Sequence, residues 1–421
     1  MSVFEIIAIL LTLSALFSYA NHRFLKLPTT IGLMGMALVL SLLLVAVGPI
    51  VPALPQVAEQ MLGSIDFNKT LLHGMLGFLL FAGAMHVDLS DLRRHGLFIG
   101  ALATFGVVIS TAVVAALTFV VLRWVGIELS FVHCLLFGAL ISPTDPISVL
   151  AILKSLGAPN DLQVQITGES LFNDGVGVVV FLAVVGLAGT GHGEHAVGTW
   201  PIAQLFVQEV LGGALFGLAI GWIAYRMLKS VDNYQVELLI SLALVNGGYA
   251  MATRLHLSGP IAMVVAGLLI GNHGRAFAMS YATRQRLDAF WELVDEILNA
   301  VLFVLLGLEL LVLTLRVQTV LAGLAVVPVV LLARALAVGL PLSIVRLFRP
   351  VRPYTLKLMT WGGLRGGISV ALALSLRQLL GQEAKASTDV ILALTYVVVV
   401  FAILVQGLSI SALSRRWIKQ A

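Results

Sequence analysis

Charged residues and cysteines are scarce in this chain of 421 residues. Asp, Glu, Lys and Arg make up 11% of the sequence against 59% hydrophobic residues, and the mean hydropathy is +1.04. This composition excludes a soluble protein and is typical of a polytopic membrane protein. Cys134 is the single cysteine, which excludes an intrachain disulfide and a cysteine metal site. We expect it to be a packing residue within a span.

Apolar runs of about 20 residues, the length that crosses a bilayer, follow one another along the chain. The first run carries Glu5 and has no basic segment before it, so we expect a retained span and not a cleaved signal peptide. We predict an all-α protein with about thirteen transmembrane helices, at 3–20, 29–47, 70–87, 96–122, 131–156, 163–189, 202–228, 236–253, 258–273, 291–315, 317–345, 355–379 and 389–412.

Basic residues are distributed unevenly over the connecting loops. With the N-terminus outside, seventeen Lys and Arg fall on loops that would be cytoplasmic and six on the opposite loops. The positive-inside rule therefore predicts an N-out, C-in orientation. The net charge of +4 is not collected in one patch, so we expect no nucleic-acid partner.

The loops are short and predict no soluble domain. The longest are 48–69 and 189–200, and the second contains His192 and His195. A solvated polar loop is favoured there over a pH sensor or a metal pair. Only SRRWIKQA follows the last span, so we expect no regulatory cytoplasmic tail.

An internal repeat is visible between GFLLFAGAMHVDL at 77–89 and LFVLLGLELLVL at 302–313. The two segments are seven spans apart, and an odd offset gives the copies opposite orientations. This is the inverted-repeat plan of many secondary transporters. On that plan, span 5 pairs with span 12 and span 6 with span 13.

Spans 5 and 12 both contain helix breakers. ISPTDPISV in span 5 holds Pro143 and Pro146, which leave the carbonyls of Ala139 and Ser142 without helical donors. TWGGLRGGISV in span 12 surrounds Arg365 with four glycines. Since interrupted helices at corresponding positions of two repeats mark the binding site of a transporter, we expect both interruptions to lie at one site.

Span 6 contains GESLFNDGVGVVVF, with two acids inside an apolar run. A charge at the bilayer centre costs roughly 2.5–3.5 kcal/mol, so such residues usually face a protein interior or an ion path. Glu169 and Asn173 are four residues apart, as are Ser170 and Asp174, so the four polar residues share one side of a helix.

An all-oxygen ion site is predicted where span 6 meets the broken span 5. Asp145, Asp174, Thr144 and Ser170 offer oxygen donors without sulfur or imidazole, a set that suits a hard cation. Removing water from a carboxylate favours its protonated form, so Asp174 could hold either a proton or a cation. If only the loaded forms cross between the two faces, cation and proton are exchanged obligatorily.

The remaining buried charges need partners as well. We expect Glu169 to pair with Arg334 of span 11 in a structural role, in preference to direct ion contact. Arg365 either donates to carbonyls of the unwound segments or offsets Asp145. Three acids of span 10 are interpreted as rim or mouth charges without a direct role: Asp295, Glu296 and Glu309.

GESLFNDG, SPTDP, the arginine of span 11 and GGLRGG, in this order, resemble the monovalent cation/proton antiporters of the sodium/proton exchanger and NhaP branch. The resemblance extends over nearly the whole chain. It implies an NhaA-like antiporter fold with crossing broken helices, and a homodimer whose core domain moves like an elevator against a dimerisation domain. It divides the chain into 1–94 and 231–315 (dimerisation domain, spans 1–3 and 8–10), 191–230 (linker span 7), and 95–190 and 316–421 (core ion-transport domain, spans 4–6 and 11–13).

The resemblance also implies residue roles. Asp174 would be the carboxylate that binds cation and proton, with Asp145, Thr144 and Ser170 helping to hold the ion. Of the supporting residues, Glu169 would pair with Arg334, Asn173 would steady the site, and Arg365 would support the helix crossing.

The pair Asn173–Asp174 resembles the electroneutral branch of the family, which implies exchange of one cation for one proton. Gly177 departs from the family pattern, where we expect a bulkier residue.

We therefore predict a secondary transporter, not an enzyme, that exchanges Na⁺ or Li⁺ for H⁺, serves pH homeostasis and needs no cofactor. Membrane lipid is the expected surrounding partner, in a bacterial inner membrane. A K⁺/H⁺ antiporter of the same fold stays open. An intramembrane aspartyl protease using Asp145 and Asp174 is disfavoured by the lack of a GxGD-type motif, and an anion carrier using Arg365 is disfavoured by the nearby acids.

Overall fold

The computed structural model describes residues 3–47, 74–155, 158–189, 199–311, 313, 316–347 and 352–419. Secondary structure in these residues is helical apart from an isolated bridge between Asp145 and Leu364. The predicted loop 48–69 and the histidines at 192 and 195 lie outside the described residues.

Helices occupy each of the regions predicted from the apolar runs. The α-helices of the first half are α1 (Val3–Ala20), α2 (Thr29–Val47), α4 (Leu76–Met85), α5 (Leu89–Ala101), α6 (Val107–Val125), α7 (Phe131–Ile141), α8 (Ile147–Ser155) and α9 (Asn160–Gly189). Those of the second half are α10 (Thr199–Lys229), α11 (Tyr234–Arg254), α12 (Gly259–Leu269), α13 (Arg275–Phe277), α14 (Tyr281–Leu308), α15 (Val317–Arg346), α16 (Thr355–Trp361), α17 (Gly367–Leu380), α18 (Lys385–Phe401) and α19 (Gly407–Lys419).

Within the described residues, eight helical segments are long and apolar enough to cross a membrane: Phe4–Leu25, Thr29–Val47, Leu89–Val125, Asn160–Ala188, Val207–Lys229, Tyr234–Arg254, Val317–Arg346 and Lys385–Trp417. Shorter apolar helices include α4, α7 and α17. The all-helical membrane architecture is thereby confirmed, while the number of thirteen crossings and the N-out orientation stay predictions.

The two predicted helix interruptions are present. The fifth span is divided into α7 and α8 around Pro143 and Pro146, which cannot donate to the preceding turn. The twelfth span is divided into α16 and α17, and Gly366 is the extended residue at the start of α17. Each half-helix therefore ends within the protein, where its terminal backbone groups need partners.

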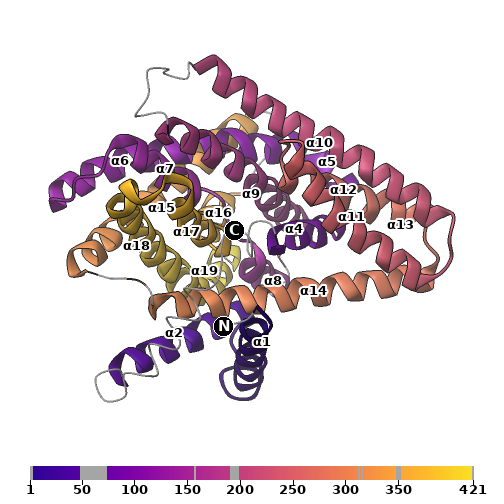
Figure 1. The fold of residues 1–421 in the computed structure, drawn as a ribbon, viewed down its shortest axis with the longest axis horizontal. Coiled ribbons are helices and arrows are strands. Elements are labelled where there is room, and N and C mark those ends of the chain that lie inside the picture. The colour runs from indigo at the N-terminus through magenta and orange to yellow at the C-terminus, as the bar shows by residue number, and fades with distance from the viewer. Residues whose placement is uncertain are drawn as a thin grey trace.

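Two groups of helices are joined by one long helix (Figure 1). Helices α10 to α13 lie on one side of the view with α4, and α6, α7 and α15 to α18 lie on the other, while α14 runs across both. At its N-terminal half α14 packs Trp291 against Phe81 of α4. Near its C-terminal end, Ser41 of α2 donates to the carbonyl oxygen of Gly307 at 2.8 Å.

The acids of α14 do not all lie where the sequence suggested. Glu296 is exposed, in agreement with a rim position, whereas Glu309 is only 2% exposed at the end of the helix. The expectation of a mouth charge is therefore wrong for Glu309. Glu309 follows the last residue of α14 and points into the protein, and the position of an acid along the sequence does not reveal this direction.

Candidate functional site

The breaks in the two divided spans meet in the middle of the fold. Asp145 donates its backbone N–H to the carbonyl oxygen of Leu364 at 2.8 Å, which joins the segment after α7 to the segment after α16. Arg365, buried at 2% exposure, donates through Nη1 to the carbonyl oxygens of Ser142 at 2.6 Å and Pro143 at 2.9 Å. A cation at these carbonyls stabilises the C-terminal end of α7. Of the two roles left open for Arg365, the structure shows bonding to carbonyls.

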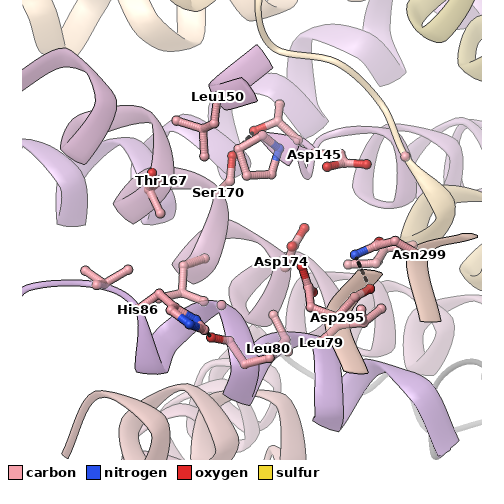
Figure 2. Close-up of a pocket in the computed structure, with 18 of the residues that line it drawn as sticks. Leu79, Leu80, His86, Asp145, Leu150, Thr167, Ser170, Asp174, Asp295 and Asn299 are labelled. Carbon is pink, nitrogen blue, oxygen red and sulfur yellow. Dashed lines mark hydrogen bonds between the residues drawn. The ribbon is translucent and has the colours of Figure 1, made fainter. Parts of the chain in front are cut away.

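A cavity of about 680 Å³ lies beside this crossing. All four predicted ion-binding residues line it: Thr144, Asp145, Ser170 and Asp174. Figure 2 shows the carboxylates of Asp145 and Asp174 in the same cavity, which they reach from the broken fifth span and from α9. The two carboxylates interact electrostatically with each other. The arrangement gathers oxygen donors and negative charge, the ligands a hard monovalent cation needs.

A hydrogen-bond network fixes the wall of the cavity behind the acids. The hydroxyls of Thr144 and Ser170 lie 3.0 Å apart, and the Asn173 amide donates to the Thr144 hydroxyl at 2.9 Å. The backbone N–H of Thr144 donates in turn to Asn173 Oδ1 at 3.4 Å. Asn173 therefore holds the unwound segment against α9.

The predicted pair of buried charges is formed. Arg334 of α15 makes a two-pronged ion pair with Glu169 of α9, through Nη1 to Oε1 and through Nη2 to Oε2 at 2.8 Å. Its Nε donates to the carbonyl oxygen of Met359 in α16 at 3.1 Å. One arginine thus neutralises Glu169 and ties three helices together.

Asp174 has a different environment, although it lies on the same helix. It is 9% exposed and has neither a hydrogen bond nor an ion pair with any described residue. A buried, unpaired carboxylate requires a proton or a cation for neutralisation. Asp174 therefore differs from Glu169 in that no basic side chain among the described residues neutralises it.

The structure explains why residue 177 is a glycine and not the bulkier residue of the family pattern. A Cβ atom at this position would collide with the ring of Pro143. Glycine lets α9 approach the Pro-broken segment closely, which brings the cavity residues of the two elements together.

Several residues of the cavity were not predicted from the sequence as part of the site. Asp295, Asn299 and Glu292 of α14 line the cavity, as do Asp88 and Asp91 at the start of α5. The residues at 292, 295 and 299 are spaced by three and four along α14, so their common face was a usable signal. Asp295 belongs to the wall beside Asp174 (Figure 2), and the expectation that it was only a rim charge is wrong.

Two interrupted helices that cross beside an acid-lined cavity, within a frame of long apolar helices, define a membrane transporter of small cations. The chain matches the family model described as "Sodium/hydrogen exchanger, transmembrane" over residues 11–416. It belongs to this family. It is therefore a secondary transporter and not an enzyme, which removes the protease alternative.

Individual relatives agree with this assignment. The Na(+)/H(+) antiporter NhaP of Pseudomonas aeruginosa is 51% identical over 417 residues, which cover 98% of this chain and 96% of the relative. The Na(+)/H(+) antiporter NhaH of Halobacillus dabanensis is 33% identical over 407 residues, 94% of each chain. The solved structure of the sodium proton antiporter MjNhaP1 from Methanocaldococcus jannaschii at pH 8 matches with a TM-score of 0.77 at 20% identity, covering 99% of both chains, and so shows the same fold.

Proposed function

We propose that this protein exchanges Na⁺ for H⁺ across the membrane by competition of the two ions for Asp174. The observation that carries the proposal is the position of Asp174, a buried carboxylate in a cavity without a partner among the described residues. Its relatives bear the names of sodium/proton antiporters, which favours the same pair of ions here.

Oxygen atoms from the broken fifth span and from α9 would hold the cation. Asp174 and Asp145 supply charge, and the hydroxyls of Thr144 and Ser170 supply neutral ligands. When Asp174 takes up a proton, the cation loses its main counter-charge and leaves. Li⁺ fits the same donors, and K⁺ is the alternative substrate, because selectivity depends on how many oxygens an ion reaches.

Access would alternate by an elevator-type motion. The core domain (95–190 and 316–421) contains the ion site, and the dimerisation domain (1–94 and 231–315) supplies the facing wall through Asp295 and Asn299. With the predicted N-out orientation, the cavity opens to the cytoplasm. Lys154 and Asn160 line its edge, and they lie on either side of the loop between α8 and α9, which is cytoplasmic in that orientation. The working form is a homodimer in a bacterial inner membrane.

Exchange would be electroneutral, one cation for one proton. Asn173 carries no charge and is engaged with Thr144, so Asp174 is the acid of this pair that changes its occupancy. Glu169 remains paired with Arg334 throughout the cycle.

The experiment is proton flux in proteoliposomes that contain a pH-sensitive dye. Na⁺, Li⁺ or K⁺ is added outside preacidified vesicles that carry wild type or Asp174→Asn. Cation-driven alkalinisation by wild type that disappears in the variant supports the proposal and ranks the ions. Absence of a response to all three ions, or full activity of Asp174→Asn, would contradict it.

Electroneutrality is tested in the same vesicles by imposing a membrane potential with valinomycin and K⁺, using Na⁺ as the substrate. An exchange rate independent of the potential is expected. A rate that rises with a potential of one sign and falls with the other would show net charge movement.

A further inference from the structure

The cavity-lining face of α14 continues beyond the cavity. Asp295, Asn299 and Leu302 line the cavity, and steps of four and three residues lead on to Leu306 and Glu309, which therefore lie on the same face. Glu309 lies fourteen residues from Asp295, about 21 Å along the helix axis. A single face of α14 thus connects the cavity, at the middle of the helix, with a buried acid just beyond its C-terminal end.

Apolar side chains close the route between the two acids. Leu302 and Leu306 are 6% and 2% exposed. Leu302 packs at the start of α17, where a Cβ on Gly367 would overlap it. Leu302 therefore closes the contact between α14 and α17 at the edge of the cavity, and the buried Leu306 follows it toward Glu309.

Glu309 is buried without the partners that a structural acid requires. Its Oε2 atom is inaccessible and accepts no hydrogen bond from a described residue. The hydroxyl of Tyr396 on α18 is likewise inaccessible and has no hydrogen-bond partner among the described residues. Glu309 and Tyr396 interact electrostatically with each other. Buried polar atoms are nearly always hydrogen-bonded, so two such atoms without partners, on residues that interact electrostatically, point to a site that is occupied in another state of the protein.

The basic residue that acts on Glu309 forms its ion pair with a different acid. Arg377 of α17 exerts a charge effect on Glu309, yet its guanidinium donates to Asp389 of α18 through Nη2 at 2.8 Å and Nε at 3.1 Å. The side chains of Arg377 and Asp389 are 39% and 30% exposed, so this ion pair lies nearer the surface than Glu309. A movement of α17 relative to α14 would separate Leu302 from Gly367 and shift the Arg377–Asp389 ion pair relative to Glu309.

We propose that Glu309 and the hydroxyl of Tyr396 form a second, transient site for the transported cation, on the path that connects Asp174 with the face of the protein opposite the cavity. The inference rests on the proposed function. A carboxylate and a phenol oxygen are hard donors that suit a monovalent cation. In the arrangement in which the cavity is open, the site at Glu309 is sealed, and it fills when access alternates.

The proposal predicts an asymmetric defect. In proteoliposomes with the protein inserted in one orientation, Glu309→Gln should raise the KM for Na⁺ on the face opposite the cavity by about tenfold and change it by less than about twofold on the cavity face. Glu309→Asp keeps the charge and should stay within about threefold of wild type on both faces. Glu128→Gln, which removes an exposed acid of the α6–α7 loop, is the matched control and should change neither value. Unchanged KM values in Glu309→Gln, or equal increases on both faces, would overturn the proposal.

A second measurement uses the unaltered protein, so that it does not depend on a variant that folds. Dicyclohexylcarbodiimide reacts with carboxyl groups in apolar surroundings, and mass spectrometry of the peptide around Glu309 measures the modification. Na⁺ in place of choline should reduce labelling of Glu309 by about fivefold, since an occupied carboxylate is protected. Labelling that is insensitive to Na⁺, or absent in both salts, would overturn the proposal. If wild type itself shows no cation-driven proton flux, the proposed function fails; if wild type is active and Glu309 tests negative, only this inference fails.

Discussion

Glu169 and Asp174 lie five residues apart on α9 and are both buried, yet they have opposite surroundings. Glu169 is 1% exposed and held in a two-pronged ion pair by Arg334, while Asp174 is 9% exposed and faces a cavity without a partner among the described residues. Burial alone therefore does not identify an ion-binding acid. The presence or absence of a neighbouring basic side chain distinguishes the two acids, because a paired carboxylate is already neutralised and an unpaired one must take up an ion.

The largest effect is expected from Asp174→Asn. The substitution keeps the size of the side chain and removes its charge, so Na⁺-driven proton flux should fall by at least about 100-fold. Folding should not suffer, since no described partner is left without its counter-charge. The measurements are flux in proteoliposomes and the thermal unfolding midpoint in detergent. A large loss of stability together with the loss of flux would mean that Asp174 has a structural role like that of Glu169.

The reverse pattern is expected at the ion pair. Arg334→Gln leaves Glu169 buried and unpaired, a change that costs about 3–5 kcal/mol of stability. The thermal unfolding midpoint in detergent should drop clearly. The double variant Glu169→Gln with Arg334→Gln should recover a large part of the loss, because neither charge remains. If the double variant is as unstable as Arg334→Gln alone, the ion pair is not the reason for the destabilisation.

A smaller effect is expected at the neutral ligands of the cavity. Thr144→Val removes a hydroxyl that bonds to Ser170 and Asn173, and the KM for Na⁺ should rise by about threefold to tenfold. Thr167→Val is the matched control, since Thr167 lines the same cavity but donates to the Gln163 carbonyl within its own helix. Equal effects of both variants would argue against Thr144 as an ion ligand.

The smallest effect is expected at the cavity mouth, from Asp88→Asn. Hydrogen bonds from the side chain and backbone of Ser90 lower the pKa of Asp88, so this acid is ionised at every pH at which the transporter would work. The variant keeps a capping side chain for α5 and loses one charge. The KM for Na⁺ should rise by about twofold, equally at about pH 6.5 and about pH 8.5, and less in high salt. An effect confined to the higher pH would show that Asp88 is protonated at the lower pH and that its pKa is not lowered.

The sequence predicted those parts of the site that depend on local chemistry. Pro143 and Pro146 on one span and the glycines around Arg365 on another break a helix wherever they occur, and the breaks are present. Glu169 and Arg334 were matched because few charges lie within the spans and each needs a partner.

The roles of Asp295 and Glu309 could not be obtained in this way. Asp295 lies on α14 and Glu309 directly follows this helix, and their burial depends on which face of the helix packs inside the protein. That packing is a tertiary property, and the acids at 295, 296 and 309 look alike in a list of span residues. The choice of Arg365 between carbonyls and Asp145 depended likewise on the geometry of the crossing.

The central claim is that sodium and a proton compete for one carboxylate, and it is tested most directly by proton release on Na⁺ binding. Titration calorimetry of the purified protein in buffers of different ionisation enthalpy measures this release. At a pH at which the empty site is protonated, the account predicts that about one proton is released for each Na⁺ bound, and that Asp174→Asn shows neither binding nor release. Na⁺ binding without proton release, or full binding by Asp174→Asn, would contradict it.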